Sequence, residues 1–194
     1  MEFIYEIPNV ISKETCEELI ENYEKDDNKE PTSISDHCVS THIRKSMHTW
    51  MTDEDIWGKI KQDVIKVIID GIDKYSDYLC DENLISNKTS INLFKDRLVF
   101  EEIYLNKSKE GDYYHWHIDS NTSSGKRIRA FSCLIYLNTL EEDQGGCTEF
   151  KCGKKVRPEQ GKLVIFPSTW TYEHRAAEVK NGGVKYTCGT WLSN

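Results

Sequence analysis

The chain has 194 residues, with 25 basic and 33 acidic side chains that give a formal net charge of −8 at pH 7. This length suits one domain built around a single core. Because the acids outnumber the bases and lysines are interspersed among them, the composition argues against a protein that grips nucleic acid through its phosphates, a function that needs a concentrated basic face.

The N-terminus and the cysteines predict a cellular compartment. The first residues are acidic and contain no apolar signal-peptide core, and no apolar run approaches the length of a membrane span. Seven cysteines are an odd number without metal-site spacing, which indicates reduced thiols, with a Cys147–Cys152 pair as the alternative. We therefore expect a cytoplasmic or otherwise intracellular protein without a signal peptide or transmembrane segment.

Two amphipathic helices are predicted in the first half. The first begins after Ser12, a good N-cap, and has apolar residues at positions 16, 19, 20 and 23. The second follows the acidic start at 52–55, and its apolar stripe runs from Ile56 to Tyr75, which indicates a helix that covers a sheet. Residues 26–38 are polar and contain Pro31, so we expect a loop there, within a longer polar segment at 26–49.

After about Phe94 the sequence changes to short strand-forming runs broken by Gly, Pro and Asn. The expected strands are residues 98–106, 114–118, 129–138, 148–151, 162–167, 174–179 and 184–192. Many short strands separated by turns predict a sandwich or barrel. The expected fold class is therefore α+β, a double-stranded β-helix (jelly roll) at about 94–194 braced by N-terminal helical support at about 1–90, all in one domain.

One short motif predicts a metal site. His117 and Asp119 are two residues apart in a strand-like run, so their side chains point to the same face and can bind one ion together. A third ligand from a distant strand completes a two-histidine, one-carboxylate set that leaves open positions and suits iron(II) and oxygen chemistry. His174 is the candidate third ligand. His115 is the alternative to His117, but only His117 has an Asp two residues on.

A lysine further along the chain suggests a carboxylate ligand. Lys185 lies on the strand expected after His174, and a carboxylate removed from water needs a charge-assisted partner of this kind. Lys180 is the alternative cation. The sequence therefore predicts a metal and a bound dicarboxylate in one cavity.

These motifs resemble those of the iron(II)- and 2-oxoglutarate-dependent dioxygenases, and most of all the prolyl 4-hydroxylase branch. That branch carries a Tyr…Gly-x-x-Tyr-x-x-His-x-Asp pattern, which is similar to Tyr104, Gly111, Tyr114, His117 and Asp119 here, although the stretch from Tyr104 to Gly111 is longer than expected. The resemblance continues through later runs and reaches back to residues 8–16 and 44–50. The later runs are 129–138, 145–150, 156–167 and the pair Lys185 and Trp191.

The resemblance implies a site and its cofactors. The His-x-Asp pair and His174 would bind Fe(II), and these ligands with Lys185 would form the catalytic set. Lys185 and Tyr136 would hold the distal carboxylate of 2-oxoglutarate, and Tyr104 would line the same pocket. The cosubstrates would be 2-oxoglutarate and O2, with ascorbate in support, and the products succinate, CO2 and a hydroxylated substrate.

Three functions follow as hypotheses. The first is hydroxylation of peptidyl proline, with a peptide or protein as the partner. The second is the same chemistry on a free amino acid, a small metabolite or a nucleobase, and the third is a non-catalytic jelly-roll binding module. Nucleic-acid demethylases of this superfamily usually carry an Arg where this chain has Trp191, so we expect neither nucleic acid nor membrane as a partner. Candidates for substrate contact are Arg44, His48, Trp116 and Arg129.

Overall fold

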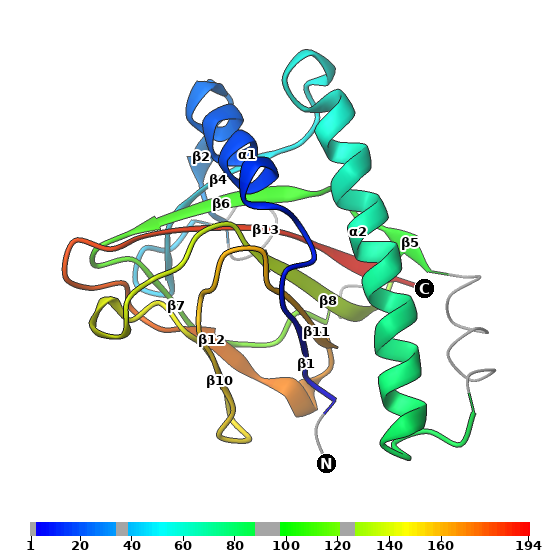
Figure 1. Ribbon diagram of the computed structural model, residues 1–194. Helices are drawn as coiled ribbons and strands as arrows, with labels where there is room; N and C mark the ends of the chain where they lie inside the picture. The colour runs from blue at the N-terminus through cyan, green and yellow to red at the C-terminus, as the bar shows by residue number, and fades with distance from the viewer. Residues whose placement is uncertain (1–2, 34–38, 88–97, 121–126) are drawn as a thin grey trace.

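Two antiparallel sheets form the body of the computed structural model, which describes residues 3–33, 39–87, 98–120 and 127–194 (Figure 1). The larger sheet has the order β1 (Tyr5–Ile7), β11 (Leu163–Pro167), β8 (Arg129–Tyr136), β13 (Val184–Ser193), β6 (Tyr104–Lys109), β4 (Met47–Trp50) and β2 (Glu30–Pro31), and β5 (Val99–Phe100) pairs with β13. The smaller sheet has the order β10 (Lys155–Val156), β9 (Thr148–Phe150), β12 (His174–Ala176), β7 (Tyr113–His117) and β3 (Arg44–Lys45). This is the expected α+β jelly-roll class.

The strands of the larger sheet present different residues to its two faces. In β8, Cys133 and Ile135 belong to the core beneath the helices, whereas Tyr136 packs with Phe150 of the smaller sheet and Phe166 of β11 in a second cluster between the sheets. This division follows from the period of two in a strand. One face of the sheet is therefore covered by helices, and the other faces the smaller sheet and the cavity described below.

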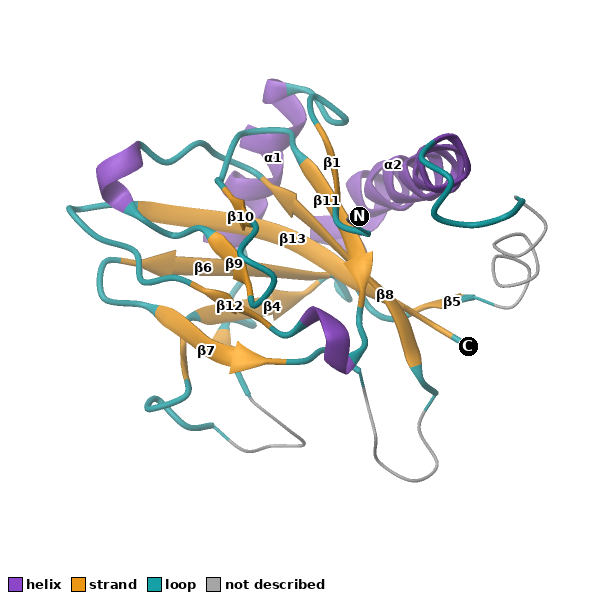
Figure 2. Cartoon of the chain, turned by 90° about the horizontal axis from the view of Figure 1, so that it is seen from below, coloured by secondary structure: helices purple, strands orange, loops and turns teal. Residues whose placement is uncertain are grey.

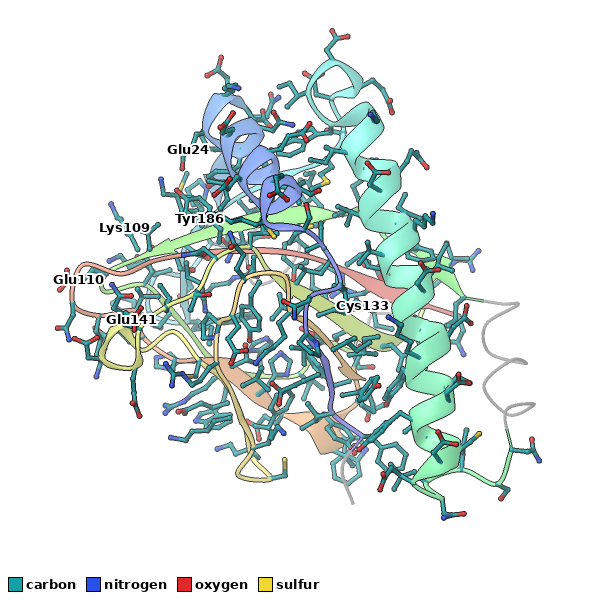
Figure 3. The ribbon with its side chains drawn as sticks, viewed as in Figure 1. Glu24, Lys109, Glu110, Cys133, Glu141 and Tyr186 are labelled. Atoms are coloured by element: carbon teal, nitrogen blue, oxygen red, sulfur yellow. The ribbon has the colours of Figure 1, made fainter. Side chains whose placement is uncertain are left out.

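The two helices are α1 (Lys13–Lys25) and α2 (Glu54–Asp81), and they lie on the same side of the larger sheet, away from β7 and β12 (Figure 2). Ser12 caps α1 as predicted, since its side chain accepts a hydrogen bond from the backbone N–H of Thr15. The predicted stripe of α2 is confirmed, and its buried members include Ile60, Val64, Ile68, Ile72 and Tyr75. In α1, Glu24 accepts a 2.6 Å hydrogen bond from the hydroxyl of Tyr186 in β13, which ties that helix to the sheet (Figure 3).

The N-terminal third differs from the expected helical support, because it also contributes β1, β2, β3 and β4 to the sheets. The expected loop at 26–49 was therefore wrong for β2, β3 and β4, while residues 34–38 lie outside the described residues. The chain crosses from the smaller to the larger sheet between β3 and β4, so it forms a wall between them. Sequence pattern missed these strands because their inward residues are mainly polar and show no hydrophobic alternation.

A buried carboxylate braces this wall. Asp26 is fully buried and accepts hydrogen bonds from the hydroxyl of Thr49 in β4, at 2.7 Å, and the indole N–H of Trp57 in α2, at 3.1 Å. The side chain and backbone of Asn28 donate to it as well. Asp26 therefore joins α1, α2 and β4, the strand that carries His48 and Trp50 to the cavity.

The cysteines and helices bear on two further expectations. The six described cysteines are all free, so the alternative Cys147–Cys152 disulfide is absent. Within the described ranges, neither α1 nor α2 combines the length and the apolar character needed to cross a bilayer.

Candidate active site

A cavity of about 610 Å³ lies between the two sheets. Strands from both sheets line it through alternate residues, as the strand period requires. The lining side chains of the larger sheet include His48, Trp50, Tyr104, Asn106, Ser108, Ser132, Leu134, Lys185, Thr187 and Trp191. The smaller sheet contributes His117 and His174, and Asp119 follows β7. The structure thus brings the predicted metal ligands and Lys185 to one cavity.

The three predicted metal ligands lie together. One ligand atom from each of His117, Asp119 and His174 falls within 4.8 Å of the others. The Nε2 atom of His117 is 3.5 Å from Oδ1 of Asp119, and Nε2 of His174 is 3.6 Å from Oδ2. His117 and His174 are cross-strand partners in β7 and β12, which explains how residues so distant in sequence meet.

Backbone hydrogen bonds orient both imidazoles. Nδ1 of His117 lies 2.8 Å from the carbonyl oxygen of His115, and Nδ1 of His174 lies 3.0 Å from that of Tyr172. Because a carbonyl can only accept, each Nδ1 carries a proton, and each Nε2 is left as the ring atom that faces Asp119. A metal ion at the Nε2 atoms requires this arrangement.

The electrostatics favour the metal-binding forms of Asp119 and His174. Burial by itself would raise the pKa of Asp119, but His174, His117 and a 2.6 Å hydrogen bond from the Ser132 hydroxyl outweigh it and hold that pKa well below its usual range. Burial lowers the pKa of His174 to about 4. A carboxylate and neutral imidazoles are the states that ligate metal ions, and one carboxylate with two imidazoles fits Fe(II).

A β-bulge brings Tyr114 to the same site. His174 pairs with His117 and Ala176 with Tyr114, so two residues of β7 lie opposite the single residue between them in β12. Bulges of this kind redirect side chains near functional sites. Here the bulge lets Tyr114 face the cavity although it is three residues from His117, and their rings stack at 3.5 Å between centroids.

Lys185 is a buried cation on the cavity wall. Its side chain is 4% exposed, and its Nζ donates a 2.8 Å hydrogen bond to the carbonyl oxygen of Gly146. Among the described residues no carboxylate lies within ion-pair distance of it, and burial lowers the pKa of Lys185 to about 8. The alternative cation, Lys180, is exposed and does not line the cavity. Lys185 is therefore positioned to bind an anionic ligand in the cavity.

Tyr104 also lines the cavity, as predicted, and a glycine sets its position. Its ring lies between Trp50, at 6.1 Å between centroids, and Trp191, at 5.0 Å. A Cβ atom on Gly189 would lie 2.7 Å from the Tyr104 hydroxyl oxygen, closer than side chains pack. The absence of a side chain at 189 therefore lets the phenol lie against β13.

Tyr136 occupies a different place from the one expected of a ligand-binding residue. It is fully buried and does not line the cavity, and its hydroxyl lies 2.6 Å from that of Thr148, which does. Sequence reasoning missed Thr148 as a site residue, although it stands in the Gly-Gly-x-Thr run. It also missed Ser132, because an alternating strand of small and apolar residues gives no sign of which serine meets a carboxylate.

The remaining candidates divide between the cavity and the outer surface. Arg44, His48 and Arg129 line the cavity. Trp116 does not: it lies beneath the Lys151 ammonium, 4.0 Å from the ring centroid, and Arg175, at 5.0 Å. His115 is exposed, so the alternative to His117 as a ligand finds no support in the geometry.

Comparison with known sequences gives one family. Residues 103–193 match the family described as the 2OG-Fe(II) oxygenase superfamily. A PKHD-type hydroxylase of Synechococcus sp. strain CC9902 is 27% identical over 95 residues, which cover 47% of this chain and 41% of that protein. A second, of strain CC9605, is 28% identical over 123 residues, covering 57% and 53%. The chain thus spans about half the length of these curated relatives.

Solved structures share the fold at low identity. A viral collagen prolyl hydroxylase of Paramecium Bursaria Chlorella virus-1, in its 2OG complex, superposes with a TM-score of 0.69 at 21% identity, covering 98% of this chain and 96% of that one. A Pseudomonas putida prolyl-4-hydroxylase gives 0.72 at 17%, covering 100% and 94%. A Trichoplax adhaerens prolyl hydroxylase bound to a peptide fragment gives 0.69 at 17%, covering 98% and 83%. The expected jelly-roll fold is confirmed.

Removal of a candidate ligand should weaken metal binding, whereas removal of a nearby histidine that is not a ligand should not. His174→Ala should weaken Mn(II) binding at least about 100-fold, since even partners that only orient ligands contribute 10- to 100-fold. His115→Ala is the matched control, because it removes an exposed histidine from the same strand as His117 and should leave affinity unchanged. Isothermal titration with Mn(II), alongside circular dichroism to check the fold, makes the comparison. Equal affinities in the two variants would remove His174 from the ligand set.

Proposed function

We propose, from the match of residues 103–193 to the 2OG-Fe(II) oxygenase superfamily, that the chain is an Fe(II)- and 2-oxoglutarate-dependent dioxygenase that hydroxylates a C–H bond of peptidyl proline. The observation that carries the proposal is the shared cavity: two imidazoles and a carboxylate face one another there, and the buried, carboxylate-free Lys185 lines the same space. A binding module without catalysis has no need of this combination.

The chain's own residues divide the work of such a reaction. His117, Asp119 and His174 would hold the iron, which together with 2-oxoglutarate and O2 supplies the oxidising power that converts a C–H bond to an alcohol, with release of succinate and CO2. Lys185 would pair with the distal carboxylate of the cosubstrate, helped by the hydroxyl of Thr148, which Tyr136 orients. Lys185 and Thr148 are both buried, and charge interactions are stronger in such a low-dielectric environment than in water.

Aromatic side chains supply a wall for a substrate ring. Tyr104 and Trp191 line the cavity, and the guanidinium of Arg129 lies over the Trp191 ring at 3.7 Å while paired with Glu101. Aromatic rings give a rigid apolar surface with little loss of side-chain entropy. The prolyl hydroxylases among the neighbours of this fold, one of them bound to a peptide, support proline in a peptide as the substrate.

The function is tested by following turnover. Purified protein with Fe(II), 2-oxoglutarate and ascorbate, the expected supporting reductant, is incubated with proline-containing peptides, free amino acids or oligonucleotides. We expect the peptides to stimulate succinate formation and to gain one oxygen atom on the proline ring, detected by mass spectrometry. Hydroxylation of a free amino acid or a base with all peptides unmodified would overturn the proline assignment, and the absence of any 2-oxoglutarate turnover would overturn the dioxygenase.

Two lysines give a matched test of the cosubstrate site. Lys185→Ala should raise the dissociation constant of 2-oxoglutarate at least tenfold, in line with the roughly 2 to 5 kcal/mol lost when one member of a buried charge pair is removed. Lys180→Ala changes an exposed lysine on the preceding turn and should alter the constant less than about twofold. Titration of the Mn(II)-loaded protein without oxygen measures both. A reversed order would move the carboxylate site to Lys180.

The lowered pKa of Lys185 predicts a pH dependence. Its pKa of about 8 in the free protein means that the ammonium loses its proton as pH rises above 8, so affinity for the anionic cosubstrate should fall, by up to about tenfold per pH unit. Lys185→Arg is the control, because a guanidinium stays protonated throughout this range. Titrations at pH 7, 8, 9 and 9.5 compare the two proteins. An equally flat profile in both would show that Lys185 does not titrate there.

A further inference from the structure

Three cationic side chains line the cavity, and one of them remains without a role. Lys185 is assigned above to the cosubstrate. Arg129 is neutralised by Glu101, with Nη2 2.6 Å from Oε2 and Nε 2.9 Å from Oε1. Arg44 has no carboxylate within ion-pair distance among the described residues. Its guanidinium makes a long hydrogen bond, 3.4 Å, from Nη1 to the carbonyl oxygen of Ser33, and it also hydrogen-bonds the Tyr114 side chain. Its charge is therefore available to a ligand.

Strand pairing holds Arg44 close to the metal-ligand cluster. Arg44 in β3 is the cross-strand partner of Tyr114 in β7, and its guanidinium carbon lies 4.5 Å from the centre of the Tyr114 ring. The ring of His117 also stacks on that of Tyr114, with 3.5 Å between the ring centroids. Only one aromatic ring thus separates the guanidinium from a candidate metal ligand, and stacking holds its planar donors in place.

A second side chain near Arg44, that of His48, has one buried polar atom without a partner among the described residues. His48 lies four residues further along the same wall of the cavity and is 4% exposed, and its buried Nδ1 atom has no hydrogen-bond partner in the described structure. Burial and the charge of Arg44 lower the pKa of His48, and the Glu30 carboxylate, 3.4 Å from its Nε2 atom, acts in the opposite direction. Buried polar atoms without partners are rare in folded proteins.

The charges in a cavity loaded with Fe(II) and 2-oxoglutarate also single out Arg44. Fe(II) and Lys185 together carry three positive charges, and Asp119 with dianionic 2-oxoglutarate carries three negative ones. Arg129 and Glu101 cancel one another. Asp119 attracts Arg44 in the free protein from beyond ion-pair distance, but its charge would be taken up by the metal. Glu30 also lines the cavity, but its carboxylate is largely exposed and lies 3.4 Å from His48 Nε2, so among the described residues Arg44 keeps no close counter-charge. A desolvated charge without a counter-charge is strongly unfavourable.

We infer that Arg44, with His48 beside it, forms a second anion subsite of the cavity and binds a carboxylate carried by the substrate. The inference rests on the proposed function and narrows its substrate class. Because Arg44 is one ring away from His117, the carboxylate would lie only a few bonds from the carbon that is hydroxylated. Two sources satisfy this chemistry: the α-carboxylate of a peptide that ends at the target proline, and an acidic side chain next to that proline.

Matched probes distinguish these sources. The Mn(II)- and 2-oxoglutarate-loaded protein is titrated without oxygen with a peptide that ends in proline against the same peptide with a C-terminal amide. It is also titrated with two proline-containing peptides that differ by Glu or Gln beside the proline. We expect the carboxylate member of at least one pair to bind at least tenfold more tightly than its amide. A difference in the first pair assigns the subsite to an α-carboxylate, and a difference in the second assigns it to an acidic side chain.

Two arginine variants complete the test. Arg44→Gln should abolish the preference for the carboxylate member, whereas Arg157→Gln, which changes an exposed arginine outside the cavity, should preserve it. Arg44→Lys keeps the positive charge but loses the planar guanidinium, so it should retain part of the preference for the carboxylate probe. That result would show that the loss of preference in Arg44→Gln does not come from a loss of fold. The inference is overturned if no carboxylate probe binds the wild-type protein more tightly than it binds Arg44→Gln.

Failure of this inference is distinguishable from failure of the proposed function. Binding of 2-oxoglutarate to the Mn(II)-loaded wild-type protein is measured first, and its absence would contradict the dioxygenase itself. Normal 2-oxoglutarate binding with no effect of Arg44→Gln on the probes would contradict only the second subsite. A tenfold or greater loss of 2-oxoglutarate affinity in folded Arg44→Gln would assign Arg44 to the cosubstrate and also overturn the inference.

Discussion

The site depends on one buried carboxylate that stays ionised. Asp119 is held in that state by two imidazoles and the Ser132 hydroxyl, against the cost of removing it from water. Each imidazole is in turn oriented by a backbone carbonyl at its Nδ1 atom. The donors are thus arranged before any metal arrives, so binding need not order flexible side chains. Ser132 contacts Asp119 directly, and β12 carries His174, so the candidate ligand set depends on both.

Antiparallel strand pairing places the side chains of the site, and the β-bulge in β7 adds one more. Cross-strand pairing places His174 opposite His117, and alternation along β13 directs Lys185 and Thr187 to the cavity while Cys188 faces the helices. The bulge in β7 then adds Tyr114 to the cavity face, which strict alternation would have turned away. The sheet thereby carries a stack from Arg44 through Tyr114 to His117, a connection that regular strands cannot make.

The cations in the cavity are costly to the fold. An acidic chain keeps Lys185 and Arg44 in a partly dry interior, and burial lowers the pKa of Lys185 because it penalises the ammonium. Well-packed apolar residues in their place would be neutral or stabilising, as for other buried charges. Groups retained at such a cost are typical of binding sites, where the ligand supplies the missing counter-charge.

The sequence by itself determined the helices, most strands, the fold class and the candidate His-x-Asp pair, because caps, apolar periodicity and the spacing of that pair are local signals. Only the tertiary structure decided that His174 meets His117, that Lys185 rather than Lys180 faces the cavity, and that the Tyr136 hydroxyl contacts Thr148. It also turned the polar 44–50 segment into strands that wall the site. These outcomes depend on register, on a bulge and on pairing partners far apart in the chain, and a period of two cannot specify any of them.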